Sequence, residues 1–66
     1  MDRKTLIRSM ESYAGGGFMT RQRFAAYMGI RDPRRAKEKY LNKLDAVDGK
    51  YYFIPDIVSE LIRRCE

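Results

Sequence analysis

Apolar residues recur at intervals of three and four over residues 2–14 and again over residues 20–28, the spacing of helices with one buried side. Asp2 and Thr20 begin these stretches, and their side-chain oxygens can accept the free amide hydrogens of a first helical turn. Three consecutive glycines follow the first stretch and Gly29 follows the second, which predicts a sharp reversal after each helix.

A third helix is predicted over residues 33–44, with Asp32 as its cap and Pro33 at its first position, where the missing amide hydrogen costs nothing. Projected at about 100° per residue, this helix has an apolar side and a polar side. Lys37 falls near the apolar side, so we expect its stem to lie along that surface while its charged end reaches water. The apolar side holds Ala36, Tyr40, Leu41 and Leu44, and the opposite side holds Arg35, Glu38 and Asn42, flanked by Arg34 and Lys39.

After the third helix the spacing of apolar residues changes to the alternation of a strand. Asp48 and Gly49 form a pair preferred in two-residue hairpin turns, so we predict a β-hairpin over residues 46–54. Pro55 ends the second strand, and an apolar stripe over residues 56–65 predicts a last helix. The pattern therefore predicts a mainly helical fold with one small hairpin.

Composition limits what such a fold can do. A chain of 66 residues is expected to form a single domain, and it buries only about 60% of the surface that its unfolded form exposes. The content of apolar residues, 44%, is too high for a disordered tail, so we expect a real but thin core. Fourteen Lys and Arg against nine Asp and Glu give a net charge of +5, which favours a polyanionic partner.

Several classes of site are not expected. The chain has no His and one cysteine, Cys65, so the usual zinc spacings are absent. Asp45, Asp48 and Asp56 are explained as turn and cap residues, not as an acid and base pair. We therefore expect no enzyme activity, no catalytic residue, no metal site and no cofactor. The lone cysteine and the lack of a long apolar run indicate a cytoplasmic protein with no membrane partner.

Two helices with a tight connection, then a hairpin and a closing helix, are the order of a winged helix-turn-helix. Residues 18–61 resemble the winged-helix excisionase family of mobile elements, which is related to the DNA-binding domain of MerR-type regulators. The resemblance is carried by "MTRQRFAAYMGI", "DPRRAKEKYLNKL" and "DGKYYFIPDIVSEL". It divides the single domain, residues 1–66, into an added helix at 1–14, a helix-turn-helix at 20–44, a wing at 46–54 and a closing helix at 56–65.

The resemblance implies that the helix over residues 33–44 enters the major groove of double-stranded DNA. Arg35, Glu38 and Asn42 then face the bases, since their side chains suit guanine, cytosine and adenine respectively. The turn "GIRDPR" is one residue longer than the usual turn of the family, and in a shifted register Arg34 and Lys39 take these places. The wing is expected to contact the minor groove or the backbone. The predicted DNA-binding residues are Thr20, Arg21, Gln22, Arg31, Arg34, Arg35, Glu38, Lys39, Asn42, Lys43, Lys50 and Tyr51.

The implied function is that of a small sequence-specific DNA-binding protein of a bacterial mobile element or prophage, associated with the nucleoid when bound. It would act as an excisionase-like accessory factor, with a recombinase as a candidate partner. Two alternatives stay open: a compact transcriptional regulator, and a protein-interaction adaptor that does not bind DNA. Because one such module is small, tight DNA binding is expected to need a homodimer or a cooperative array, joined through the first or last helix.

Overall fold

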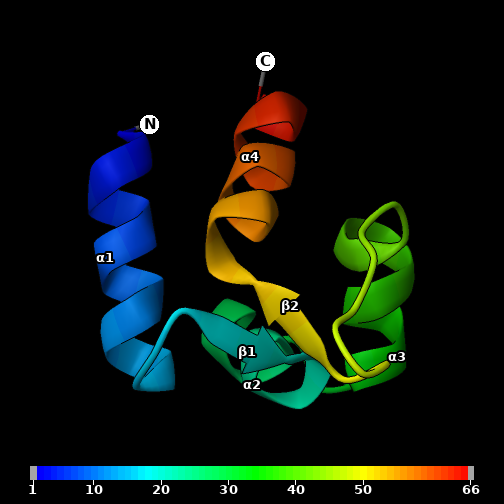
Figure 1. The fold of residues 1–66 in the computed structure, drawn as a ribbon. Helices are drawn as coiled ribbons and strands as arrows, with labels where there is room; N and C mark the ends of the chain where they lie inside the picture. Colours follow the sequence, from blue (N-terminus) through cyan, green and yellow to red (C-terminus); the bar gives the residue numbers. More distant parts are fainter. Residues whose placement is uncertain (1, 66) are drawn as a thin grey trace.

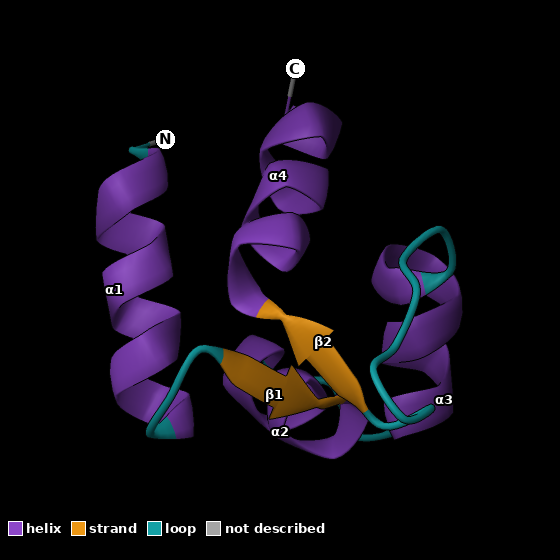
Figure 2. Cartoon of the chain, in the orientation of Figure 1, coloured by secondary structure: helices purple, strands orange, loops and turns teal. Residues whose placement is uncertain are grey.

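In the computed structural model, which describes residues 2–65, helices pack around a two-stranded antiparallel sheet (Figures 1 and 2). The sheet lies across α2, while α1 and α4 stand side by side on one side of it and α3 lies on the other. The expectation of a mainly helical fold with a small antiparallel sheet is confirmed. The elements are α1 (Arg3–Ala14), β1 (Phe18–Thr20), α2 (Arg21–Met28), α3 (Pro33–Ala36), the π-helix η1 (Lys37–Leu41), β2 (Tyr51–Phe53) and α4 (Ile54–Cys65).

The first two helices begin and end at the residues that the sequence indicates. Asp2 caps α1 and Thr20 caps α2, each accepting a hydrogen bond of 3.2 Å from a first-turn amide. Gly15 and Gly29 follow the two helices in the left-handed conformation, with φ of 79° and 77°. Both helices are therefore fixed by local chemistry, and both predictions are confirmed.

The third helix differs from its prediction in its second half. Asp32 caps it as expected, but the α-helix extends only over Pro33–Ala36 and continues as η1, which ends at Leu41 and not at residue 44. A π-helix places an additional residue in each turn, but the predicted sides are confirmed. Leu41 is buried and Tyr40 and Leu44 pack against the core, while the residues of the predicted polar side are exposed. The Tyr40 ring packs 6.0 Å from that of Phe24.

The predicted hairpin over residues 46–54 is mostly wrong. Its turn forms, with Asp48 and Gly49 at φ of 54° and 70°, but the only pairing across that turn is a bridge between Val47 and Tyr51. The segment before the turn is too short for a strand, so β2 pairs with β1, a strand that the sequence analysis did not expect. The register joins Phe18 to Phe53, Met19 to Tyr52 and Thr20 to Tyr51.

The core joins all the helices. Met10 of α1 is fully buried against α4, and Arg3 also donates a hydrogen bond to Ser59 of that helix. The closing helix begins at Ile54, two residues earlier than predicted, with Pro55 in its first turn. None of the helices formed by residues 2–65 is long and apolar enough to cross a membrane. The largest fully buried side chains are Phe24, Met10, Leu41, Ile54, Ile57 and Val58.

Candidate nucleic-acid interface

Three segments enclose a hollow of about 370 Å³, which we call the basic hollow. They are the start of α2, the first turn of η1 and the turn that precedes β2, and they meet toward the lower right of Figure 1. Each segment contributes one cation: Arg21, Lys37 and Lys50 respectively. The lining residues are Thr20, Arg21, Gln22, Lys37, Gly49, Lys50 and Tyr52.

A second hollow of about 250 Å³ adjoins the first, since Arg21 and Lys37 line both. We call α3 and η1, with the capping residue Asn42, the third helical segment. The rest of the lining comes from this segment, at Arg34, Glu38 and Asn42. These three residues are spaced by four, so they lie along one side of the segment. We call this second space the polar hollow. The two hollows are neighbours on the surface, with Arg21 and Lys37 between them.

The positive charge of this surface is not neutralised within the described chain. Among residues 2–65, Glu60 accepts every ion pair, and Arg21, Lys37 and Lys50 take part in none. The N-terminus of α2 adds a partial positive charge, because its first amide groups lack partners in the helix. Glu38 is the one carboxylate in the lining of either hollow. The surface is therefore suited to an anionic partner of extended shape.

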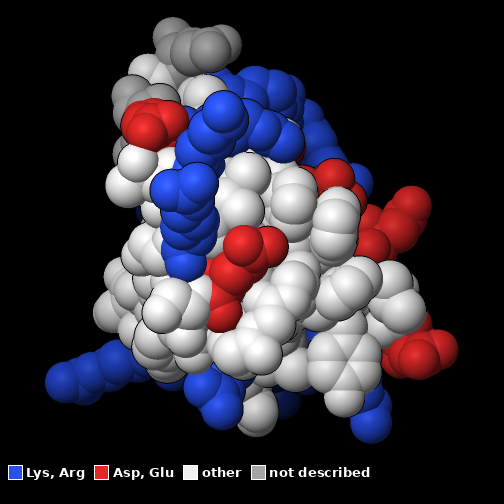
Figure 3. All heavy atoms as spheres, turned by 60° about the vertical axis from the view of Figure 1, so that its left-hand side comes forward, with Lys and Arg blue, Asp and Glu red and all other residues white. Residues whose placement is uncertain are grey.

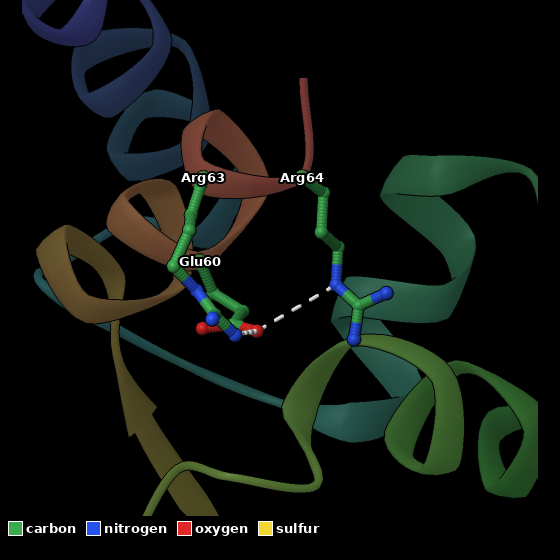
Figure 4. A network of polar contacts seen from close by, with 3 residues as sticks. All are labelled: Glu60, Arg63 and Arg64. Atoms are coloured by element: carbon green, nitrogen blue, oxygen red, sulfur yellow. Dashed lines mark hydrogen bonds and ion pairs between the residues drawn. The ribbon is translucent and has the colours of Figure 1, made fainter. Parts of the chain in front are cut away.

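A polar network of Glu60, Arg63 and Arg64 lies within α4, the helix that packs against the other side of η1 (Figure 4). The carboxylate of Glu60 accepts a hydrogen bond from the Arg63 guanidinium at 2.6 Å, and Arg64 lies 3.6 Å away. The hydrogen bond from Arg63 lowers the pKa of Glu60, aided by the charges of Arg63, Arg64 and Lys43 and opposed by burial. Glu60 is only 8% exposed, whereas Arg63 and Arg64 are exposed, so the network joins a buried carboxylate to two cations at the surface.

The same network reaches Tyr40. The guanidinium carbon of Arg64 lies 5.2 Å from the centre of the Tyr40 ring, and the amine of Lys39 lies 5.5 Å from it. Cations at such distances are attracted by the face of an aromatic ring. Lys39 therefore lies over Tyr40 and not in either hollow.

The structure brings part of the predicted site together. Arg31, Arg35, Lys39, Lys43 and Tyr51 are exposed but line neither hollow. The predicted residues that do line one are Thr20, Arg21, Gln22, Arg34, Glu38, Asn42 and Lys50. Of the two residues that a shifted register would use, Arg34 lines a hollow and Lys39 does not.

Sequence reasoning missed Lys37, Gly49 and Tyr52, which also line the basic hollow. Lys37 is the most important of them because it is the cation shared by both hollows with Arg21. Its position near the apolar side of the helix was the available signal. A cation at the edge of an apolar stripe lies close to the neighbouring helix, and here that neighbour is the start of α2.

Basic residues also gather elsewhere on the surface. Arg3, Lys4 and Arg8 are exposed on α1, and Figure 3 shows a band of Lys and Arg toward the ends of the chain. Charge alone therefore does not identify one face of the molecule as a binding site. The basic hollow is singled out because cations from three segments converge around it.

Comparison of this chain with protein-family models, with curated proteins and with solved structures finds no match. The residues of the candidate interface are therefore what point to its chemistry.

Proposed function

We propose that this chain binds double-stranded DNA as a winged helix-turn-helix. In this proposal α2 and the third helical segment are its two helices, and the turn at residues 48–50 with the short sheet is a reduced wing. A helix-turn-helix presents its second helix to the major groove, while the first helix contacts the backbone. The order and packing of these elements, with Phe24 and Leu41 buried between them, support this assignment.

The observation that carries the proposal is the set of three cations around the basic hollow. Arg21, Lys37 and Lys50 come from separate segments, and none of them has an ion-pair partner among residues 2–65. Gathering like charges is unfavourable unless a counter-charge binds, and phosphates supply that charge along a nucleic-acid backbone. Thr20 and Gln22 add donors beside the start of α2, where helix amides also favour phosphate.

Base recognition is assigned to Arg34, Glu38 and Asn42, which share one side of the third helical segment. Arg pairs with guanine, Asn with adenine, and Glu accepts from cytosine, so the three chemistries of the major groove are available. Arg34 thus replaces Arg35 of the sequence prediction. Arg31, Arg35 and Lys43 are assigned to flanking phosphates.

Within this proposal the resemblance to excisionases favours a recombination accessory factor, and a compact transcriptional regulator is the alternative role. Both roles follow from occupying DNA. A footprint on the native locus distinguishes them: repeated, phased sites at the end of a mobile element support the first, and a lone promoter operator supports the second.

An adaptor that binds protein and not DNA is the second candidate function. One feature favours it: a groove of about 300 Å³ between the helices, with little polar lining. It shares no residue with the basic or polar hollow. The groove is lined by Leu6, Tyr27, Met28, Tyr40, Leu61, Arg64 and Cys65.

Binding to a random duplex at several salt concentrations tests the proposal. Neutralising three phosphates gives a slope of about −3 in a plot of the logarithm of affinity against that of salt concentration. Binding that is absent at low salt, or independent of salt, would contradict DNA binding and support the adaptor.

A further inference from the structure

The outer side of the short sheet carries a group of exposed apolar side chains. Phe18, Val47, Tyr51 and Phe53 are between 44% and 51% exposed, and the rings of Phe18 and Phe53 lie 5.1 Å apart. Side chains alternate across a strand, so these residues point away from the core while Met19 and Tyr52 are buried beneath them. We call Phe18, Val47, Tyr51 and Phe53 the aromatic face.

The fold does not account for this face. The core is already closed by Met19 and Tyr52, and an exposed group of large apolar side chains marks an interaction surface more often than a chance arrangement. Tyr51 is predicted from the sequence to contact phosphate. In the structure its partner in the register is Thr20, so both side chains lie on the outer side of the sheet, and of the two Thr20 lines the basic hollow.

We infer that the aromatic face binds the same face of a second copy of this chain. Two molecules of charge +5 repel each other, so a contact between copies needs a surface without charge. Neither strand contains a charged residue: β1 is Phe18–Thr20 and β2 is Tyr51–Phe53. The cross-strand pair of Phe18 and Phe53 also gives each copy the same two rings to present to its partner.

The area of the aromatic face indicates how strongly two copies can associate. Half-exposed side chains of this size offer roughly 100 Å² each, so two copies bury at most about 800 Å² through these four residues. Stable complexes bury about 1,200 Å² or more. Association is therefore weak in free solution. It becomes effective where another interaction already holds the copies close together.

This inference rests on the proposed function, because DNA is what holds the copies together. The sheet connects the two surfaces: Thr20, which lines the basic hollow, is the register partner of Tyr51, so the two side chains lie on the same side of the sheet. Copies on adjacent stretches of a duplex can then meet through their aromatic faces. The contact lies on the sheet and not on the first or last helix, where the sequence analysis expected it.

Binding isotherms on two random duplexes test the inference. One duplex, of about 12 base pairs, holds a single copy, and another, of about 60 base pairs, holds several. Cooperative contact predicts about tenfold tighter binding per copy on the long duplex. The Phe18→Ser/Phe53→Ser variant should lose that tenfold while binding the short duplex within about twofold of the wild type. Tyr13→Ser is the matched control, since Tyr13 is 41% exposed but lies on α1.

A crosslinking measurement covers the case in which the double variant unfolds. Phe18→Cys in a Cys65→Ser background should form dimers with a short bismaleimide on the long duplex, and Arg8→Cys in the same background should not. Full cooperativity in a folded double variant, no cooperativity in the wild type, or equal crosslinking of both cysteine variants would overturn the inference. If neither duplex binds, the proposed function fails, and crosslinking at high protein concentration still decides whether the faces associate.

Discussion

Two groups of basic residues in this molecule have the same charge and different surroundings. Arg63 and Arg64, near the end of α4, both lie within 4 Å of the Glu60 carboxylate, and Arg64 also covers the Tyr40 ring. Arg21, Lys37 and Lys50 surround a hollow and have no ion-pair partner among residues 2–65. The first group has a counter-charge within α4, and Arg64 extends from it to η1; the second is the group that the proposed function assigns to phosphates.

The difference shows how to read a chain with a net charge of +5. A count of charges treats both groups alike. What separates them is that Arg63 and Arg64 lie beside the Glu60 carboxylate, whereas Arg21, Lys37 and Lys50 come from three segments that meet around one hollow. Cations that converge in this way favour an anionic ligand.

The largest effect on DNA affinity is expected from a comparison of two double variants, one in each group of basic residues. Arg21→Ala/Lys37→Ala and Arg63→Ala/Arg64→Ala each remove two positive charges. The first should weaken binding to any duplex by about 100-fold, because each cation lost removes a contact to a charged phosphate. The second should change it by less than about threefold. Titration of each variant into labelled random DNA checks this, and equal losses would show that only net charge matters.

Sequence discrimination is expected to depend on the side of the third helical segment that lines the polar hollow. Arg34→Ala or Asn42→Ala should reduce the preference for the native site over random DNA by about 1–3 kcal/mol per residue. Lys39→Ala should leave that preference unchanged because Lys39 lies over Tyr40. Competition binding with the native and a random duplex measures both. A loss of discrimination in the Lys39 variant alone would reverse the assignment.

The parts of this account that the sequence could predict are those set by neighbours along the chain. Asp2, Thr20 and Asp32 cap helices through hydrogen bonds to residues two or three positions away. The turn at Asp48 and Gly49 likewise depends on those two residues alone. Such signals are readable because the whole interaction lies within one short window.

The parts that could not be predicted depend on distant segments. The strand Phe18–Thr20 has three residues, which are too few to show the alternation of a strand. It forms by pairing with residues 51–53, which are distant in the sequence. The change from α- to π-helix at Lys37 has no signal in the residues from Pro33 to Leu41 that the spacing of apolar positions could reveal. The role of Lys37 follows from both, since its place in the hollow exists only once η1 lies beside the start of α2.

A smaller and uniform effect is expected at the turn. Lys50→Ala should weaken specific and random duplexes alike by about tenfold and reduce the slope against salt by about one. The reason is that Lys50 is exposed at the rim of the basic hollow and can reach phosphate without reading a base. Salt titrations of the variant and of Lys39→Ala as control check it. A change in sequence preference would show that Lys50 contacts a base.

The smallest effect concerns the neutralised group. The pKa of Glu60 is lower in the folded chain than its ordinary value of 4.5, chiefly because Arg63 donates a hydrogen bond to it. Ionised Glu60 therefore stabilises the fold above about pH 4.5, and this stabilisation is lost as pH falls through the lower folded value.

Thermal unfolding of Glu60→Gln against the wild type measures that contribution. The variant should melt at a lower temperature than the wild type at pH 7, and the difference should shrink in acid. Its affinity for random DNA should stay within about twofold of the wild type, because only one charge distant from the hollow changes. A difference in melting temperature that is constant from pH 7 to strong acid would contradict the role of the Glu60 charge.

The central claim, that the basic and polar hollows bind DNA, is tested most directly by amide chemical shifts in an NMR titration with a short random duplex. The account predicts that the largest shifts occur at Thr20, Arg21, Lys37 and Lys50, with those of Arg63 and Arg64 almost unchanged. Shifts concentrated on α1 and the end of α4, with residues 20–22 and 37 unaffected, would contradict it.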